Sequence, residues 1–506
     1  MLKIHGQSYT IDDFQPFIEK RGKLQVTSEV KSKIVHSHNL LTKLIDSDET
    51  IYGLNTGFGA LSKYRIPKDD RLLLQLNLVR SHATGVGNPL ETGITRFILI
   101  LKLINFCHGY SGIRWEVVQL IRDLINHDIL PLIPSKGSVG ASGDLAPLAH
   151  MALTLIGEGE VHFSDRILPS IVALKEAGLE PIVLQQKEGL SLVNGTQVST
   201  ALAICGLLRL QNILKVADII GAMSVESCLF SRLVFRPKIH RLKKHPGQLQ
   251  SATNVWELLA KSEIVASHRD CDHVQDPYSF RCIPHIHGAS RELFTGAKRI
   301  IENEINSVSD NPLILPETGE VVTSGHFHAE VVAQTSDTLS IAASEMGAVS
   351  ERRIARMMEG IGDNIPIFLA ETPGIDSGYM MLQVTAASLV SENKTLSHPA
   401  SVDSLPTSAG KEDFVSMSTW AGRKLLKILE NVEIILAIEL IVSCHALDLY
   451  KPLKPGIGTK IARNYIRRHI KFAKNDRILT HEIEQAVDLV KGRRLVQAVE
   501  RVVKLF

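Results

Sequence analysis

The sequence predicts a mainly α-helical protein, in which a long helical bundle follows a smaller N-terminal region. A chain of 506 residues with 44% hydrophobic residues is long enough to bury a large core. Its first part mixes short segments with many glycines, as in 52–59 and 137–143. Much of the later part carries apolar residues three or four positions apart, with few internal Gly or Pro. Long buried helices that pack as a bundle follow from this spacing.

The expected helices are separated by loops rich in turn-forming residues. Apolar spacing predicts long helices over 198–230, 291–306, 329–359, 378–397 and 418–450. Turn formers gather at 309–312, 397–399 and 406–410, and we expect site residues in such loops. We therefore expect an N-terminal domain over 1–197 and a central and C-terminal helical bundle over 198–506.

Charge gives no reason to expect nucleic acid or a membrane as a partner. The 56 basic and 54 acidic residues leave a formal net charge of +2. Charged residues interrupt the apolar runs, as Lys102 does in 97–104, so no transmembrane helix is expected. The segment Met1–His5 reaches polar residues at once, unlike a secretory signal, and we expect a cytoplasmic protein.

Cysteine and histidine spacing predicts neither a disulfide framework nor a metal site. No Cys-x-x-Cys pair occurs, which favours free thiols in a reducing compartment. The six cysteines are Cys107, Cys205, Cys228, Cys271, Cys282 and Cys444. The pairs His285-x-His287 and His326-x-His328 lack a matching cluster of further ligands, so no metal is expected.

The segment 133–150, IPSKGSVGASGDLAPLAH, carries the most chemical information in the chain. A plain interpretation is a tight turn before a helix, with Ser142 or Asp144 as the helix cap. A phosphate-binding loop would need a Gly-Lys-Ser/Thr ending, which is absent. A serine hydrolase would use Ser142 as nucleophile, and Gly140-x-Ser142 begins its motif, but Asp144 stands where the second glycine is required.

Backbone cyclisation fits these residues better. The nitrogen of Gly143 can attack the carbonyl carbon of Ala141 if the two are pressed together, which small residues permit. Loss of one water from the ring and one from Ser142 would then leave an exocyclic alkene, which is a strong electrophile.

At these residues the chain resembles the aromatic amino acid ammonia-lyases, whose methylideneimidazolone group forms from Ala-Ser-Gly. The resemblance covers nearly the whole chain and depends on separated segments in the same order. These segments are Tyr52–Gly59, Ser81–Ala83, Gly137–Pro147, Asn194–Gln197, Gln275–Arg281, Ser309–Pro312 and Ser401–Asp413.

The resemblance implies a mainly α fold of the fumarase/aspartase type, with a long central bundle and a smaller N-terminal domain that bears the electrophile. It implies a 4-methylideneimidazol-5-one group formed autocatalytically from Ala141, Ser142 and Gly143, with no external cofactor. It also implies a homotetramer whose active sites are shared between subunits.

The resemblance assigns roles to the catalytic residues. Tyr52 would remove the β proton, Tyr278 would support the developing charge, and Arg281 would bind the substrate carboxylate through two parallel hydrogen bonds. Without the resemblance, an arginine at this point would be read as part of an ordinary ion pair. Asp144 would assist cyclisation, or act only as a helix cap.

Other residues would hold the reactants. Asn194 and Gln275 would orient the electrophile and the substrate, and Phe327 would line the pocket. Without the resemblance, Asn194 before Gly195 would be read as a turn residue.

Three further residues would select the substrate. His82, Met380 and Glu412 would face the ring, and an imidazole can exchange hydrogen bonds with a histidine and a carboxylate. The related phenylalanine and tyrosine enzymes commonly carry an amide where this chain has Glu412. We therefore expect elimination of ammonia from L-histidine to give trans-urocanate, the first step of histidine degradation.

Three departures from the usual pattern keep other substrates open. His326 replaces an asparagine, Lys411 a glutamine and Phe414 a histidine. A rearranged pocket would accept tyrosine or phenylalanine, as an ammonia-lyase or as an aminomutase that returns ammonia to the β carbon. A serine hydrolase that uses Ser142, or a binding protein that has lost catalysis, are the alternatives from other classes.

Overall fold

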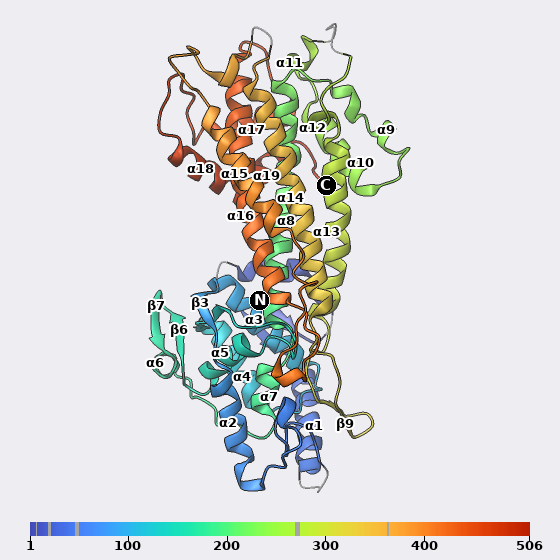
Figure 1. The fold of residues 1–506 in the computed structure, drawn as a ribbon, viewed down its shortest axis with the longest axis vertical. Coiled ribbons are helices and arrows are strands. Elements are labelled where there is room, and N and C mark those ends of the chain that lie inside the picture. The colour runs from blue at the N-terminus through green and yellow to red at the C-terminus, as the bar shows by residue number, and fades with distance from the viewer. Residues whose placement is uncertain (7, 19–21, 46–49, 269–273, 362–363) are drawn as a thin grey trace. The chain divides into compact units, whose positions relative to one another are not determined.

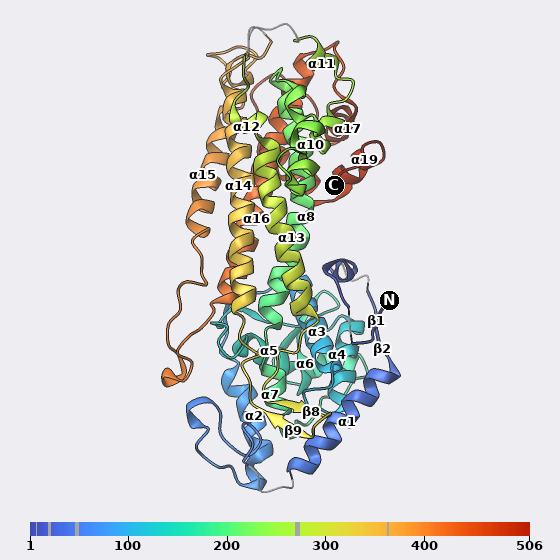
Figure 2. The same ribbon diagram turned by 90° about the vertical axis from the view of Figure 1, so that its right-hand side faces the viewer.

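The structure is a computed structural model that describes residues 1–6, 8–18, 22–45, 50–268, 274–361 and 364–506. The chain forms two compact units, each made of three stretches of sequence. Unit 1 comprises residues 1–205, 298–337 and 399–423, and unit 2 comprises residues 206–297, 338–398 and 424–506. Figures 1 and 2 label the elements in two views.

Unit 1 combines short strands with helices of moderate length. Its helices are η1 (Ile11–Phe17), α1 (Ser28–Ile45), η2 (Gly59–Leu61), η3 (Lys68–Asp70), α2 (Arg71–His82), α3 (Thr92–Cys107), α4 (Trp115–His127), α5 (Leu145–Leu155), α6 (Ser170–Glu176), α7 (Glu188–Val193) and η6 (Ser408–Gly410). Its strands are β1 (Leu2–Ile4), β2 (Leu24–Val26), β3 (Val86–Pro89), β4 (Leu130–Pro131), β5 (Pro134–Lys136), β6 (Glu160–Phe163), β7 (Arg166–Pro169), β8 (Leu313–Leu315) and β9 (Glu320–Val322).

The strands form four small sheets. β1 and β2 pair in parallel, whereas β3–β5, β4–β6–β7 and β8–β9 are antiparallel. In the β8–β9 hairpin, Ile314 lies opposite Val321. No sheet formed by the described residues has more than three strands, so helices make up most of the core of unit 1.

Helix α3 lies at the centre of that core. Every residue from Ile94 to Cys107 is buried, because apolar side chains predominate around the whole circumference of the helix. Its two buried cations have partners: Arg96 pairs with Asp128, and Lys102 binds backbone and amide oxygens. Helices α2, α5 and α7 pack against one another in the same unit.

Unit 2 is a helical bundle. Four long helices run side by side in both ribbon views: α8 (Gln197–Ser227), α13 (Ile283–Ile305), α14 (Glu330–Met358) and α16 (Ser418–Leu449). The remaining helices are η4 (Arg232–Phe235), α9 (Pro237–His240), α10 (Pro246–Leu258), α11 (Glu263–Ala266), α12 (Tyr278–Arg281), η5 (Ile367–Leu369), α15 (Met380–Leu396), α17 (Ile457–Ile466), α18 (Thr480–Lys491) and α19 (Arg494–Glu500).

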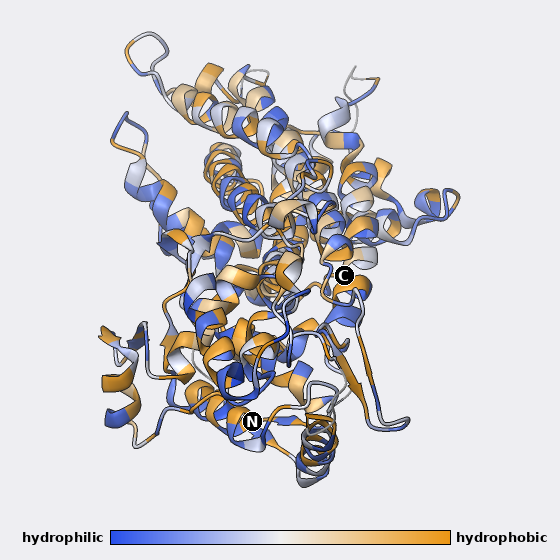
Figure 3. Cartoon of the chain, turned by 60° about the horizontal axis from the view of Figure 1, so that its bottom comes forward, coloured by the Kyte–Doolittle hydropathy of each residue, from blue (hydrophilic) through white to orange (hydrophobic). Residues whose placement is uncertain are grey.

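The helix predictions are confirmed. The five long segments expected from apolar spacing correspond to α8, α13, α14, α15 and α16, with ends that mostly agree within a few residues. The main difference is α13, which begins eight residues before the expected start, at Ile283. The helices carry hydrophobic and hydrophilic residues along their length (Figure 3), as expected for helices with one face in a core.

Buried ion pairs explain the charges that interrupt the apolar runs of the bundle. Glu439 of α16 accepts two hydrogen bonds from Arg353 of α14, and both side chains are fully buried. Asp218 of α8 accepts hydrogen bonds from His287 and Arg291 of α13. Removing one partner of such a pair leaves an unpaired buried charge, which is costly. Among the described residues, no helix is both long and apolar enough to cross a membrane.

Candidate active site

The Ala141–Ser142–Gly143 turn lies in unit 1 between β5 and α5. Gly143 has a φ of +73° and forms a parallel bridge with Gly195. A Cβ built on Gly143 would lie 2.3 Å from the carbonyl oxygen of Gly195, so no other residue fits without movement of the backbone. Ala141 is buried, and Ser142 is partly buried. The turn is therefore tightly enclosed at Gly143.

The segment before α16 holds the other side of this turn. Ser416 donates through its hydroxyl to the carbonyl of Gly140, and the Met417 amide donates to the carbonyl of Val139. A Cβ on Gly140 would lie 2.3 Å from the hydroxyl oxygens of Ser416 and Ser418. Two loops that are distant in sequence thus fix the backbone around Ala141.

Asp144 is fully buried and occupies the N-cap position of α5, but its side chain makes no capping bond to that helix. Its carboxylate instead accepts hydrogen bonds from the amide and hydroxyl of Ser199, in the first turn of α8, and from the hydroxyl of Ser138. Of the two roles considered for Asp144, the side chain does not perform that of a helix cap, because this carboxylate ties α8 to the turn. Burial raises the pKa of Asp144, although these hydrogen bonds oppose the shift.

Glu412 connects the turn to the 407–412 loop. The hydroxyl of Ser142 donates to Oε1 of Glu412 at 2.7 Å. Oε2 accepts hydrogen bonds from the hydroxyls of Thr407 at 2.6 Å and Ser408 at 2.9 Å. Burial alone would raise the pKa of Glu412, but these three hydrogen bonds and nearby His82 lower it below the usual value. Glu412 is therefore ionised at neutral pH.

His82 and Tyr52 belong to the same neighbourhood. His82 ends α2, and burial lowers its pKa while the charge of Glu412 partly opposes the shift. At neutral pH the imidazole is therefore uncharged. The Tyr52 hydroxyl accepts a hydrogen bond from the amide of Gly59 at 3.0 Å. Gly59 begins η2, which packs against η6 in the Glu412 loop.

Asn194 ends α7 next to Gly195, and its side-chain amide donates to the carbonyl of Asn311 at 3.0 Å. Phe327 is partly buried in the connection between β9 and α14. Both residues lie in unit 1, as do the turn, Tyr52, His82 and Glu412.

The three departures from the family pattern are exposed in this chain. His326 contacts the hydroxyl of Ser324, and Lys411 lies at the tip of the 407–412 loop. Phe414 is 60% exposed, and its ring stacks on His328. Within the part of the chain that the structure describes, none of the three forms a hydrogen bond, ion pair or ring contact with Ser142, Glu412 or His82.

Gln275, Tyr278 and Arg281 form a second cluster, in unit 2. Arg281 donates to the side-chain oxygen of Gln275 at 2.9 Å, and its guanidinium lies 4.7 Å from the Tyr278 ring centre. No carboxylate among the described residues pairs with Arg281, and its Nε has no hydrogen-bond partner there. An ordinary ion pair, the plain interpretation of this arginine, is not formed with any described carboxylate.

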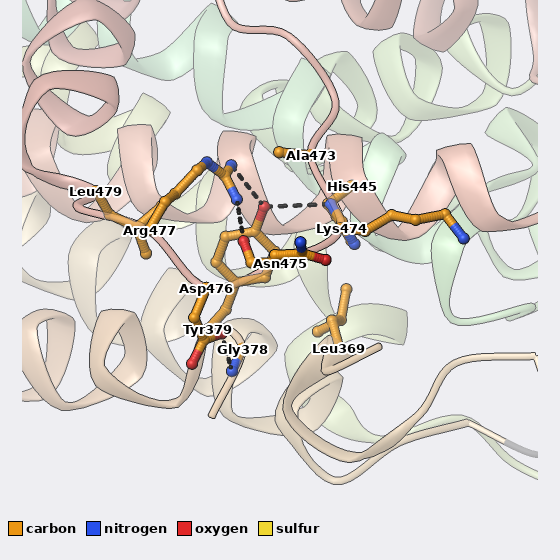
Figure 4. A pocket seen from close by; sticks show the side chains of 10 residues that line it. All are labelled: Leu369, Gly378, Tyr379, His445, Ala473, Lys474, Asn475, Asp476, Arg477 and Leu479. Carbon is orange, nitrogen blue, oxygen red and sulfur yellow. Dashed lines mark hydrogen bonds between the residues drawn. The ribbon is translucent and has the colours of Figure 1, made fainter. Parts of the chain in front are cut away.

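Met380 begins α15, also in unit 2. The preceding residue, Tyr379, is buried, and its hydroxyl contacts Nδ1 of His445 at 3.1 Å and Nη2 of Arg477 at 3.2 Å (Figure 4). Asp476 accepts hydrogen bonds from the amides of residues 377 and 378. These contacts fix the start of α15 and hence the backbone of Met380.

The two histidines of the 285–287 pair contact different partners. His287 pairs with Asp218, while His285 packs edge-on against His240. No group of three or more metal-ligating side chains gathers within the described part of the chain. Five cysteines are free thiols, and Cys271 lies outside the described residues.

The hydrogen bond of Ser142 argues against the serine hydrolase alternative. Ser142 donates to a carboxylate and not to an imidazole nitrogen, so the described residues do not form the Ser-His arrangement that activates a hydrolase serine. Gly140 and Gly143, on either side of Ala141 and Ser142, have no room for a Cβ. Glycine at both positions suits a backbone that must bend on itself.

Comparison with known proteins decides the family. The sequence model described as aromatic amino acid lyase matches residues 9–468. The chain belongs to the aromatic amino acid lyase family. The histidine ammonia-lyase of Gloeobacter violaceus is 46% identical over 99% of this chain and 97% of its own length.

Solved structures of this lyase family show the same fold. The histidine ammonia-lyase of Trypanosoma cruzi superposes with a TM-score of 0.91 at 37% identity, covering 99% of this chain and 95% of that one. The tyrosine aminomutase of Streptomyces globisporus superposes with a TM-score of 0.94 at 30% identity, covering 100% and 99%. The expected mainly helical fold is confirmed.

Several residues around the site were not predicted from the sequence. They are Lys102, Ser199, Thr407, Ser408, Ser416 and Ser418. Hydroxyl residues near loops are too common to single out. Lys102 did carry a signal, because a lysine within the apolar run 97–104 needs a buried partner.

Proposed function

We propose that this lyase eliminates ammonia from L-histidine to give trans-urocanate, using an electrophile made from Ala141, Ser142 and Gly143. The observation that carries the proposal is the hydrogen bond from Ser142 to Glu412, beside a Gly143 that is pressed against Gly195. The histidine ammonia-lyases that resemble the chain over its full length support the choice of substrate.

The residues present fit the self-formed group. The amide nitrogen of Gly143 forms a bond to the carbonyl carbon of Ala141, and the Gly143 N–H proton passes to the carbonyl oxygen. That oxygen leaves as water with the N–H proton of Ser142, and a C=N bond forms between the Ala141 carbon and the Ser142 nitrogen. The hydroxyl of Ser142 and the hydrogen on its Cα leave as a second water, which produces the methylidene carbon. Gly143 has a positive φ and lies against the Gly195 backbone, so the turn that carries the two reacting atoms is tightly enclosed.

The completed 4-methylideneimidazol-5-one would supply an electrophile that converts the substrate amine into a better leaving group. No external cofactor is needed. Tyr52 removes the β proton, and Tyr278 supports the developing charge. Arg281 binds the substrate carboxylate, because a guanidinium offers two parallel donors. Asn194, Gln275 and Phe327 position the reactants.

Glu412 and His82 account for the choice of histidine. An ionised Glu412 accepts a hydrogen bond from a ring N–H, and a neutral His82 offers one donor and one acceptor. A phenyl ring has neither an N–H to donate nor a ring nitrogen to accept. It would form neither hydrogen bond and would leave Glu412 without a donor from the substrate ring. Met380 covers the ring through apolar contact.

A homotetramer with shared sites is part of the proposal. Tyr278 is 70% exposed in the single chain, although its role requires a place in an enclosed site. A neighbouring subunit would cover it. Mixing Ser142→Ala and Arg281→Ala subunits tests this, because hybrid tetramers regain activity only if one site draws these residues from different chains.

A cytoplasmic location completes the proposal. It is supported by the free thiols at Cys107, Cys205, Cys228, Cys282 and Cys444, which suit a reducing compartment. Fractionation of the source cells tests it.

The intact mass of the purified protein tests the electrophile. Each chain should be lighter than its sequence mass by two water molecules, and Ser142→Ala should lack this loss. A folded wild-type protein of unmodified mass would overturn the proposed function.

A further inference from the structure

Lys102 is a fully buried lysine directly behind the segment that supports the electrophile loop. Its ammonium donates to the carbonyl oxygen of Asn194 at 2.5 Å and reaches Oε1 of Gln197 at 3.4 Å. It also lies 5.1 Å from the centre of the Phe106 ring. The two hydrogen bonds bracket Gly195, so Lys102 holds both ends of the short segment 194–197.

This segment is also held from the other side. Gln197 donates through its amide to the hydroxyl of Ser309 at 2.8 Å, and the Asn194 amide donates to the carbonyl of Asn311. Thr196 donates through its hydroxyl to Glu304. Lys102 is thus the cationic member of a set of contacts that leaves the 194–197 backbone little freedom.

A buried lysine without a directly bonded carboxylate is costly to keep. Burial lowers the pKa of Lys102 to about 7, while the charges of Asp310 and Asp144 favour the ammonium and that of Lys187 opposes it. An apolar side chain of similar length would avoid the desolvation of the ammonium. Such a residue suggests a role that packing alone does not explain.

The role follows from what Gly195 contacts. Its carbonyl accepts a hydrogen bond from the Asp144 amide at 2.8 Å, and its backbone leaves no space for a Cβ on Gly143. A shift of Gly195 by a fraction of an ångström would let Gly143 relax away from Ala141. Cyclisation depends on that approach, as reactions between positioned groups do.

We propose that Lys102 is a positioning residue for formation of the electrophile: by fixing the backbone carbonyl of Asn194 and the side-chain oxygen of Gln197, it holds Gly195 against Gly143. The inference rests on the proposed function, because it concerns the same self-formed group. Lys102 touches none of the reacting atoms and acts only through the 194–197 backbone.

The test compares two buried lysines. Lys102→Met removes the ammonium and keeps the apolar stem. Lys187→Met is the matched control, since Lys187 is also fully buried but binds Ser111, Ser191 and Asp310 and not the 194–197 segment. Wild type and both variants are synthesised in a pulse, and the folded fraction is isolated by size exclusion. The share of chains lighter by two waters is then followed by intact-mass spectrometry.

We expect Lys102→Met to lose the two waters at least about tenfold more slowly per folded chain than wild type, with Lys187→Met close to wild type. Equal rates for wild type and Lys102→Met, or equal slowing of both variants, would overturn the inference and leave the proposed function intact. A wild-type protein of unmodified mass would instead overturn the proposed function. If either methionine variant yields no folded protein, Lys102→Gln and Lys187→Gln are compared instead. The same rates of water loss then decide the outcome.

Discussion

The hydroxyl of Ser142 and the carboxylate of Glu412 are joined by a 2.7 Å hydrogen bond across 270 residues of sequence. The bond links the serine that is proposed to lose its hydroxyl to the carboxylate that is proposed to receive the substrate ring. Glu412 is itself held by two hydroxyls, which keep it ionised and aimed at the turn. Under the proposed function, formation of the electrophile and choice of substrate both involve the Glu412 carboxylate.

Replacing Glu412 tests its part in substrate choice. Glu412→Gln keeps the shape of the side chain but replaces one acceptor oxygen with an NH₂ donor, so the imidazole loses its ionised partner. We expect kcat/KM for L-histidine to fall about 100-fold, measured by urocanate absorbance. Asp413→Asn, at the exposed neighbouring carboxylate, should retain activity. Full activity of Glu412→Gln would remove the main argument for histidine.

Tyr52→Phe should separate catalysis from formation of the electrophile. Without the phenol the β proton has no base, and kcat should fall about 10²- to 10⁴-fold. The mass loss of two waters should persist, because the Tyr52 hydroxyl contacts Gly59 and not the Ala141–Gly143 turn. Tyr64→Phe, at an exposed tyrosine, is the matched control. A variant with unchanged kcat would show that another group is the base.

Gly143→Ala should prevent cyclisation. The new Cβ would lie 2.3 Å from the Gly195 carbonyl oxygen, and the turn must open to accept it. Gly178→Ala is a matched control, since Gly178 has a similar φ of +70° but no atom within 4 Å of its added Cβ. Both variants bear the strain of a left-handed alanine, about 1 kcal/mol. Intact mass should show two waters lost in Gly178→Ala and none in Gly143→Ala. Normal maturation of Gly143→Ala would refute the tight contact.

The titration of Lys102 gives a pH-dependent prediction. Its pKa is about 7 in the folded protein against 10.5 for a free lysine, so between these values the unfolded chain binds more protons. The free energy of unfolding of wild type relative to Lys102→Met should therefore rise with pH, by about 1 kcal/mol per unit above pH 7. Below pH 7 the difference should level off.

Urea unfolding of both proteins at pH 7, 8 and 9 measures this difference. Asp310, Asp144 and Lys187 are present in both proteins, so their own titration largely cancels. A difference that does not change with pH would show that Lys102 keeps an ordinary pKa.

Much of the fold follows from the sequence because helix periodicity is local. The segments that became α8, α14 and α16 show it over about thirty residues each, long enough to outweigh their internal charges. The partners of those charges could not be predicted, because the pairing of Arg353 with Glu439 depends on how α14 and α16 pack. The division into domains at residue 197 stays a prediction that limited proteolysis can test.

The site was predictable only in part. Ala141, Ser142 and Gly143 are adjacent in sequence, so their chemistry can be inferred from their order. The bond between Ser142 and Glu412 depends on the 399–423 stretch joining unit 1, which no local pattern shows. Asp144 also precedes its helix as a cap would, yet its carboxylate binds the amide and hydroxyl of Ser199 at the start of α8, a contact that depends on how distant segments pack.

The most direct test offers the purified enzyme L-histidine, L-tyrosine and L-phenylalanine separately. Released ammonia and the near-ultraviolet absorbance of each conjugated acid are followed together, and β-amino acids are sought by mass spectrometry. We expect urocanate and ammonia from L-histidine, with no comparable turnover of the other two. Turnover of L-tyrosine or L-phenylalanine in preference to L-histidine, or a β-amino acid as the main product, would contradict the assignment of a histidine ammonia-lyase.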